Sequence, residues 1–512
     1  MFNDWRPKLG DKFVRSPRVK LHPLRRVLGI PGLFSTAYGD LGSSIYYALG
    51  LVALMALGAA PVALGIAGIF FVFTALTYAE GTAMFPEAGG SASFARHGLN
   101  DLMGFISGWS LMFGYIVTIS ISAYTIPSYL GYFWEPLKAS PEIHTAVAMG
   151  IVALLMFINV IGVRESSQLN FGLAMLDITT QILIIAAAVI LLFNPAVFWQ
   201  RITGYWPSTP DLIFGVAIAA IAFTGVETIS QMSEEARRPQ EKAPRAYAWV
   251  TIVVLAIYVG ISVAAFSALT PPELGSTWVT DPVAGIAQGI SKAVVPYEMA
   301  KGFTEPTHQA IVFLLQGLRT ALPILVAVLA ATILFIATNA GILGISRLAF
   351  SLGRFRLIPA ELGHVHSRFK TPFISILVFG LIALILQLPG FFGPDVFANL
   401  GGLYAFGSML SFALAHLSIL ALRVRKPDLP RPFKLRLNVK IANRELPITA
   451  ILGLLGTGVI WVVVVILQPY SRWVGFGWLL IGLGIFFLFR RLKRTSVDQS
   501  STPGAGPVIG QK

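Results

Sequence analysis

The chain has 512 residues, of which 55% are apolar and only 12% are charged, and it contains no cysteine. Soluble domains carry about 25% charged residues, so this composition excludes an ordinary soluble protein. The net charge of +14 does not indicate nucleic-acid binding, because the basic residues alternate with apolar blocks and do not gather in one domain. The missing cysteines exclude disulfides, iron–sulfur clusters and thiolate metal sites.

Apolar blocks recur along the whole chain, and several exceed the ~18–20 residues that a helix needs to cross a bilayer. A basic tail, 1–30, precedes the first block, and a tail rich in Ser, Gly and Pro, 491–512, is expected to be disordered. We therefore predict an all-α, polytopic membrane protein with a permease domain over 31–490. We predict twelve spans at 31–57, 60–84, 101–133, 145–163, 170–195, 210–231, 245–269, 319–348, 371–389, 394–423, 446–468 and 473–490.

The basic residues also predict the orientation of the chain. If the amino terminus is cytoplasmic, 32 of the 38 Lys and Arg residues fall on the cytoplasmic side of the predicted spans. Positive charge concentrates on the untranslocated side of membrane proteins. We therefore expect a cytoplasmic-membrane protein with both termini inside. The basic residues of the tail 1–30 are expected either to contact anionic lipid headgroups or only to keep this end of the chain on the cytoplasmic side.

Two spans are expected to be interrupted near the middle. The sixth span contains Thr224, Gly225 and Glu227, and the first contains two glycines, an aspartate and serines, namely Gly39, Asp40, Gly42, Ser43 and Ser44. These spans open two predicted repeats, 31–195 and 210–423, which two further helices follow at 446–490. Paired discontinuous helices that meet near the bilayer midplane are typical of inverted-repeat transporters.

The polar residues of these spans suggest what binds there. A charge inside a bilayer costs at least ~2.5–3.5 kcal/mol, so each carboxylate needs a function or a partner. Asp40 and carbonyls near Gly39 and Gly225 would suit a cation, whereas helix amino termini would suit an anion. Glu227 is the candidate proton carrier; its alternative role is that of a neutral hydrogen-bond donor in helix packing.

Two tyrosines are further candidates for the same site. Tyr47 lies two helical turns after Asp40 on the same face, and Tyr404 follows a pair of glycines in the tenth span. Each could instead be a packing or interfacial tyrosine.

Three other features have less certain roles. Asp177 lies in the fifth span, and the sequence suggests no partner for it. Glu80 near the end of the second span is expected to be structural. The stretch 270–318 contains an amphipathic segment, Val283–Val295, which is either a lid over the pathway or a surface insertion.

The order of motifs resembles the amino acid/polyamine/organocation (APC) permease superfamily over about 30–490. Tyr78-Ala79-Glu80 and Pro86-Glu87-Ala88-Gly89-Gly90-Ser91 are similar to the family's second-span exit. Its sixth-span signature resembles Phe223-Thr224-Gly225-Val226-Glu227 followed by Glu234-Glu235-Ala236-Arg237-Arg238-Pro239, and its loop after span eight resembles Ser346-Arg347, Arg354 and Pro372. The resemblance implies twelve helices, a five-plus-five inverted-repeat fold like that of the leucine transporter, alternating access and, usually, proton coupling.

The first-span motif resembles the potassium uptake branch of this superfamily. Amino acid permeases typically lack an acid in that break, and a carboxylate there would repel the carboxylate of an amino acid. The resemblance implies a solute site of Asp40, Tyr47, Thr224, Glu227 and Tyr404.

We therefore predict a secondary transporter, not an enzyme, for proton-coupled uptake of a small cation or cationic solute, with potassium favoured. An amino acid permease is the alternative, and a channel or membrane receptor is the alternative from another class. The expected partners are the lipid bilayer, the solute and a proton, with a homodimer as one form the protein could take. No cofactor, nucleic acid or metal site is expected, apart from Asp40 as a potassium ligand.

Overall fold

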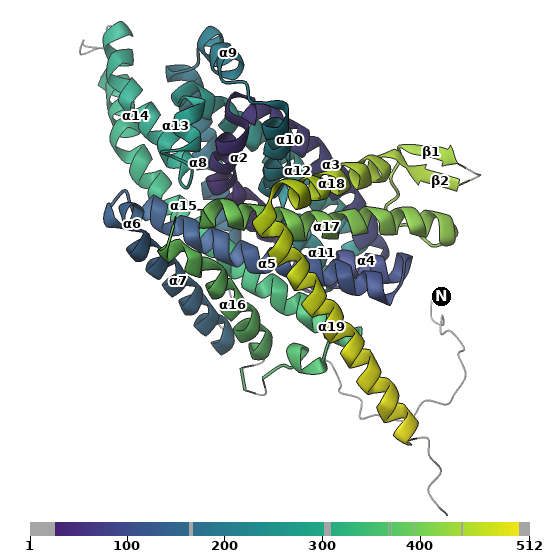
Figure 1. The fold of residues 1–512 in the computed structure, drawn as a ribbon. Helices are drawn as coiled ribbons and strands as arrows, with labels where there is room; N and C mark the ends of the chain where they lie inside the picture. The colour runs from purple at the N-terminus through teal and green to yellow at the C-terminus, as the bar shows by residue number, and fades with distance from the viewer. Residues whose placement is uncertain are drawn as a thin grey trace, which may run out of the picture.

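The computed structural model describes residues 26–162, 167–301, 309–366, 368–369, 371–393, 395–441 and 444–500. Long helices pack around one another in a single bundle (Figure 1). Most of the basic tail predicted over 1–30 lies outside the described residues. The helices are α1 (Ile30–Leu41), α2 (Ile45–Ala56), α3 (Ala60–Met84), α4 (Ser91–Gly98), α5 (Asp101–Leu130), α6 (Pro136–Ala139), α7 (Pro141–Ile161), α8 (Ser167–Leu191), α9 (Pro195–Gly204), α10 (Thr209–Ala219), α11 (Thr228–Gln231), α12 (Pro239–Ala268), α13 (Pro271–Gly275), α14 (Pro282–Lys301), α15 (Gln309–Arg354), α16 (Phe373–Gln387), α17 (Val396–Arg425), α18 (Ile448–Leu467) and α19 (Pro469–Ser500).

Among the described residues, eleven helical segments are long and apolar enough to cross a membrane. The first of them, Ile30–Met84, has 55 residues, and a straight helix of that length would be about 80 Å long, far more than one crossing needs. The chain interrupts this segment with a 3₁₀ turn at Leu57–Ala59, where Leu57 has a φ of 44°, and then returns as α3. The segment therefore makes two crossings, and the predicted all-α, polytopic fold is confirmed.

The first span is interrupted more mildly than we expected. A 3₁₀ turn at Gly42–Ser44 separates α1 from α2, and all of its residues keep right-handed helical backbone angles. The Ser43 hydroxyl donates to the backbone carbonyl of Asp40 at 2.8 Å, which supports the tightened turn. The span therefore changes its helix type at the predicted place without unwinding into an extended segment.

The sixth span is interrupted fully. A 3₁₀ turn at Ala220–Phe223 follows α10, and Thr224 is extended, with φ −76° and ψ 152°. Gly225 has a φ of 107°, a conformation that residues with a Cβ rarely adopt. The chain resumes helical structure at α11. Glycine at this position thus permits the turn that stops the helix inside the membrane.

The stretch predicted as a loop at 270–318 is largely helical. The short helix α13 is followed by α14, which begins at Pro282 as expected but continues past Pro296 to Lys301. The eighth span, predicted at 319–348, belongs to α15, which has 46 residues and begins at Gln309. Hydropathy alone underestimated the length of α15, because both ends of this helix extend beyond the apolar residues of the predicted span.

Two features near the carboxyl end were not predicted. Strands β1 (Asn438–Ile441) and β2 (Arg444–Pro447) pair in an antiparallel hairpin between α17 and α18. Helix α19 runs obliquely across the bundle and continues to Ser500, ten residues past the predicted end at 490 (Figure 1). Lys and Arg, which begin this extension, are good helix formers and so favour it. The remainder of the predicted disordered tail lies outside the described residues.

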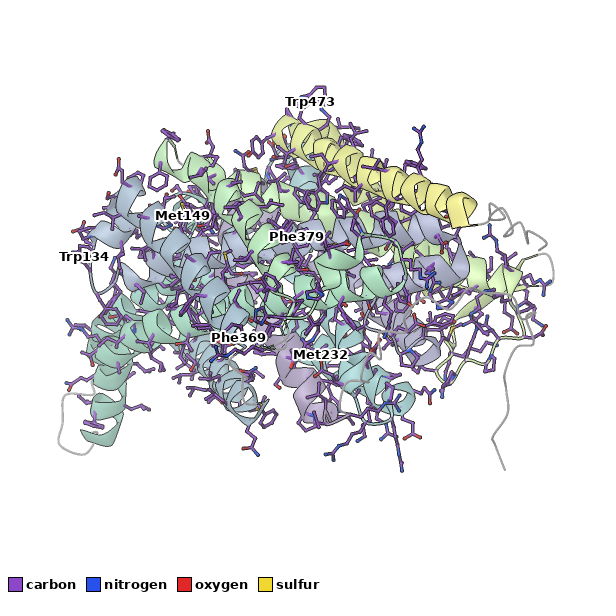
Figure 2. All side chains as sticks on the ribbon, turned by 90° about the horizontal axis from the view of Figure 1, so that it is seen from below. Trp134, Met149, Met232, Phe369, Phe379 and Trp473 are labelled. Atoms are coloured by element: carbon purple, nitrogen blue, oxygen red, sulfur yellow. The ribbon has the colours of Figure 1, made fainter. Side chains whose placement is uncertain are left out.

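The surface of the bundle is apolar, as expected for contact with lipid. Trp473 of α19 projects outward and is 72% exposed, and Trp134 also lies at the periphery (Figure 2). Inside the bundle, many buried Ser and Thr hydroxyls, such as those of Thr118 and Ser262, donate to backbone carbonyls four residues earlier in their own helices. This arrangement satisfies polar groups without water and allows close helix contacts.

Candidate functional site

The structure brings Asp40 and Glu227 to one buried place between the first and sixth spans. Each is only 2% exposed. Oδ2 of Asp40 accepts a hydrogen bond from the Thr228 hydroxyl at 2.7 Å. Oε2 of Glu227 accepts one from the backbone N–H of Gly225 at 3.0 Å. The two carboxyl groups interact electrostatically, so whatever binds one of them also affects the other.

The two interruptions pack directly against each other. A Cβ at Gly225 would lie 2.9 Å from Cγ of Asp40 and 3.0 Å from the backbone nitrogen of Leu41. Carbon atoms need about 3.5 Å for an optimal contact. Glycine therefore serves two purposes here, since it permits the positive φ and lets the sixth span reach the Asp40 carboxyl group.

One carboxylate oxygen at this place has no partner. Oδ1 of Asp40 is buried and accepts no hydrogen bond from any residue that the structure describes. An ionised carboxylate is an acceptor only, and burying an unsatisfied acceptor is costly. The site can therefore receive a hydrogen-bond donor or a cation.

The two predicted tyrosines lie beside the carboxylates. The Tyr47 hydroxyl is 2.9 Å from Oγ of Ser44, and Tyr47 and Tyr404 lie within electrostatic range of each other. Tyr404 interacts electrostatically with both Asp40 and Glu227. The structure thus brings the tenth span to the same site as the first and the sixth.

The other predicted residues stabilise the backbone at the interruptions, and their side chains offer no unpaired polar group to the site. Ser43 donates to its own helix, and the Thr224 hydroxyl donates to the carbonyl of Ile221 at 2.7 Å. A Cβ at Gly42 would lie 2.6 Å from the Tyr38 ring, and one at Gly39 would contact Ile336 of α15 at 3.4 Å. In this conformation these four residues allow close packing and hold the interruptions in shape.

Two further tyrosines that the sequence analysis did not select lie at the site. Tyr115 of α5 lies within electrostatic range of Glu227 and Asp40, and Tyr78 of α3 lies within range of Glu227. Both hydroxyls are buried and have no hydrogen-bond partner among the described residues. They are available as donors to a bound solute. Neither lies in an interrupted span, so local sequence gave no reason to choose them.

Tyr258 of α12 joins the two interruptions and was also missed. Its hydroxyl is 2.5 Å from the carbonyl oxygen of Leu41 and 2.9 Å from that of Ala222. Both carbonyls lie at the interruptions, where helical hydrogen bonding is incomplete. Because the hydroxyl has one proton, the two carbonyls share a single donor, and Tyr258 thereby links the two interruptions.

Ion pairs lie toward both faces of the bundle. Lys138 bonds both carboxylate oxygens of Asp281 at 2.7 Å, beside the chain between α13 and α14. On the face that carries residue 26, Arg347 and Arg354 of α15 pair with Glu235 at 3.0 Å and Glu234 at 2.5 Å. Together with the burial of both site carboxylates, these contacts indicate an occluded conformation.

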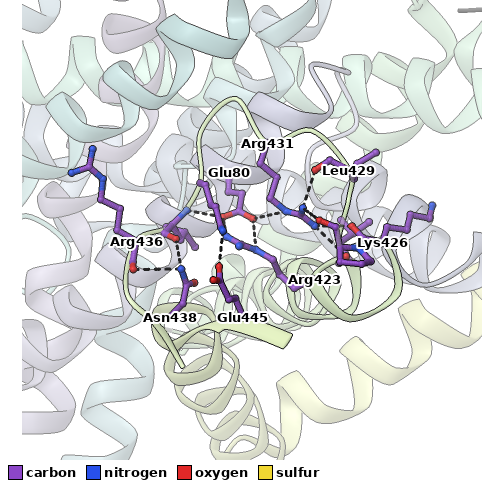
Figure 3. A network of polar contacts seen from close by, with 12 residues as sticks. Glu80, Arg423, Lys426, Leu429, Arg431, Arg436, Asn438 and Glu445 are labelled. Atoms are coloured by element: carbon purple, nitrogen blue, oxygen red, sulfur yellow. Dashed lines mark hydrogen bonds and ion pairs between the residues drawn. The ribbon is translucent and has the colours of Figure 1, made fainter. Parts of the chain in front are cut away.

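Glu80 has the structural environment that we expected. It is fully buried, and Arg423 of α17 donates to both of its oxygens, at 2.9 and 2.6 Å (Figure 3). The backbone N–H of Leu435 adds a third bond, at 2.9 Å. This cluster connects the chain after α17 to the end of α3, and none of its hydrogen bonds involves Asp40 or Glu227.

Apolar spans, two interruptions that meet, and buried carboxylates between them define a secondary transporter. The comparisons agree, because the amino acid permease family model matches residues 28–488. The chain belongs to this family, and its relatives are transporters, not enzymes.

The relatives differ in the solutes that their names state. A branched-chain amino acid permease of Bacillus subtilis (strain 168) is 26% identical over 93% of this chain and 95% of its own length. A methylthioribose transporter of the same organism is 24% identical over 88% of this chain and 90% of its own length. The mitochondrial cationic amino acid transporter 3 of Arabidopsis thaliana is 25% identical over 81% of this chain and 65% of its own length.

Proposed function

We propose that this permease takes up an amino acid, or a similarly compact solute with an ammonium group, and that Asp40 binds the ammonium. The unpaired Oδ1 of Asp40 carries this proposal. An ammonium group offers three donors and a positive charge, which suit a buried carboxylate oxygen beside tyrosine hydroxyls. The names of the relatives favour an amino acid over the potassium ion that the first-span motif suggested.

The carboxylate of an amino acid needs its own donors in this site, because Asp40 and Glu227 repel it. The unpaired hydroxyls of Tyr115 and Tyr78 are suitable donors that approach from α5 and α3. An amino acid would then lie with its ammonium toward the first span and its carboxylate toward these two tyrosines. Such an orientation removes the objection that an acid in the first span excludes amino acids.

Glu227 is the proton carrier in this proposal. It lies beside Asp40, and in this conformation it accepts a backbone hydrogen bond from Gly225. A carboxyl group that alternates between a dry, occluded site and a wet, open one changes its preference for a proton. We propose that this alternation couples solute uptake across the cell membrane to proton entry, with both termini in the cytoplasm.

Potassium remains the second candidate, for one structural reason. Asp40, Tyr47, Glu227 and Tyr404 are four of the five residues that the potassium-branch resemblance named, and their proximity at the two interruptions supports this candidate. The fifth, Thr224, bonds its own backbone. Because the chain belongs to a permease family, a transporter for either solute is favoured over a channel or a receptor.

Uptake into proteoliposomes under an inward proton gradient tests the proposal. The solutes are radiolabelled branched-chain and cationic amino acids and, as a potassium tracer, rubidium. We expect gradient-driven uptake of an amino acid that Asp40→Asn abolishes, whereas Glu227→Gln keeps exchange but loses accumulation. Asp211→Asn, an exposed aspartate at the start of α10, is the matched control. Uptake of rubidium alone would replace the amino acid by potassium, and uptake of neither would refute the proposal.

A further inference from the structure

Asp177 of α8 is a buried acid that the proposed solute site does not use. It is 1% exposed and accepts three hydrogen bonds. Oδ1 accepts from the Tyr46 hydroxyl at 2.6 Å, and Oδ2 accepts from the Tyr38 hydroxyl at 2.8 Å and from the Gln181 amide at 2.7 Å. Three donors thus stabilise the carboxylate without a cation.

The two tyrosines lie on opposite sides of the interruption in the first span. Tyr38 belongs to α1 and Tyr46 to α2, with the 3₁₀ turn Gly42–Ser44 between them. Residues eight apart lie two turns apart on the same helix face, so both hydroxyls reach one carboxylate only while the two halves stay in line. Asp177 of α8 therefore bridges α1 and α2 across the 3₁₀ turn that separates them.

Neighbouring groups hold this arrangement in place. The Tyr38 ring lies against Gly42, where a Cβ would come within 2.6 Å of it, and it stacks on Phe34 at a centroid distance of 5.8 Å. The Tyr129 hydroxyl of α5 donates to the carbonyl of Tyr46 at 2.7 Å. The Tyr46 ring also packs edge-on against the Tyr129 ring at a centroid distance of 5.6 Å, so both tyrosine rings have neighbours that restrict their movement.

A movement of one half of the first span that opens the site toward one face would take that half away from α8. Movement of α1 opens the face that carries residue 26 and breaks the Tyr38 bond, whereas movement of α2 opens the opposite face and breaks the Tyr46 bond. Each movement removes one donor from a buried carboxylate, and hydrogen bonds to charged groups are the strong ones. The occluded state keeps both bonds, so the carboxylate opposes both movements.

We propose that Asp177 is a positioning residue that holds both halves of the first span closed, and that Tyr38 and Tyr46 separately control opening toward the two faces. This inference goes beyond the proposed solute and proton chemistry. It requires only that the protein alternates between two open states, so its test uses no solute.

The absence of cysteine from the chain makes the test direct, because a single introduced cysteine reports on its own position. Ser35→Cys reports on α1 and Ala53→Cys on α2, and both positions are buried in the occluded state. A membrane-impermeant maleimide is applied to one face at a time, in vesicles of either orientation. Tyr38→Phe should raise labelling of Ser35→Cys about tenfold from the residue-26 face and leave Ala53→Cys unchanged.

Tyr46→Phe should do the reverse, raising labelling of Ala53→Cys from the opposite face alone. Asp177→Asn should raise both, since it weakens the shared acceptor. Tyr124→Phe is the matched control, because Tyr124 is a buried tyrosine of α5 outside this cluster, and it should change neither reporter. Thermal unfolding of each variant separates opening from loss of the fold.

The inference depends on which of the two cysteine reporters each tyrosine variant makes accessible, and from which face. Equal changes at both reporters in each tyrosine variant, or no change in either, would overturn the inference. Directional labelling in a protein that transports no amino acid would leave the inference standing and refute only the proposed solute. If Asp177→Asn does not fold, the two tyrosine variants still give this decision.

Discussion

Thr228 donates its hydroxyl proton to Oδ2 of Asp40 at 2.7 Å and so joins two residues that are 188 positions apart in the chain. The bond connects the start of α11 with the end of α1. It leaves Oδ1 as the oxygen of Asp40 without a described partner. In the proposed solute site, Thr228 therefore determines which carboxylate oxygen of Asp40 stays free to bind the solute.

Replacement of Thr228 tests this relationship. Thr228→Val keeps the shape of the side chain but removes the donor, so Asp40 is free to turn away from the solute. We expect KM for the transported solute to rise about 10-fold or more, which corresponds to the loss of one hydrogen bond to a charged group. Thr228→Ser restores the donor and should restore KM. An unchanged KM in Thr228→Val would contradict the role of this bond.

Gly225→Ala should abolish transport and destabilise the protein. An added methyl group would lie 2.9 Å from Asp40 Cγ at a φ of 107°, so both the contact and the backbone become strained. Such backbone strain costs about 1–3 kcal/mol. The measurements are uptake and the thermal unfolding midpoint in detergent. Gly150→Ala of α7 is the control, because a Cβ there meets no atom within 4 Å, and it should match the parent protein.

Arg423→Met should destabilise the protein strongly. The change leaves the Glu80 carboxylate buried without its main cationic partner, for which the expected cost is about 3–5 kcal/mol. The control is Lys434→Ala, which removes an exposed pair with Glu445 whose side chains are 50% and 44% exposed. That exposed pair should contribute at most about 1 kcal/mol. Similar unfolding midpoints for the two variants would contradict the importance of burial at Glu80.

Asp281 should make stability depend on pH. Burial raises the pKa of this carboxyl group to about 6, although the nearby Lys138 ammonium lowers it. The folded protein then binds a proton more tightly than the unfolded chain does between about pH 4 and pH 6. Stability should therefore fall as pH rises through this window, by about 1–3 kcal/mol, and then level off.

Unfolding midpoints of Asp281→Asn and of the parent, measured from pH 4 to pH 7, check this expectation. The variant should lose this part of the pH dependence, because an amide does not titrate. Asp211→Asn changes an exposed aspartate instead and should leave the parent profile intact. Identical profiles for Asp281→Asn and the parent would show that Asp281 does not titrate in this range.

Both interruptions could be placed from sequence, because their causes are local. Gly225 adopts a backbone conformation that few other residues tolerate, and Ser43 competes for a helical carbonyl. The extent of each interruption was less predictable. The first span stays helical on both sides of its 3₁₀ turn, whereas the sixth becomes extended at Thr224.

The partners of the buried acids were beyond sequence reasoning. Asp177 had no visible partner in its own span, and its donors Tyr38 and Tyr46 lie more than 130 positions earlier in the chain. Tyr258 likewise lies in an apolar helix that gives no sign of a polar role. Thr228 was the exception, because a hydroxyl beside Glu227 at an interruption could have been chosen.

The sequence by itself determined that this chain crosses a membrane as helices and that two of the crossings are disturbed by polar residues. Lipid offers no hydrogen-bond partners, so length, hydropathy and local composition suffice for those conclusions. Only the tertiary structure decided which residues meet, such as Thr228 with Asp40 and both first-span tyrosines with Asp177. Those contacts depend on how separate helices pack, and packing geometry is not encoded in the polarity of any single span.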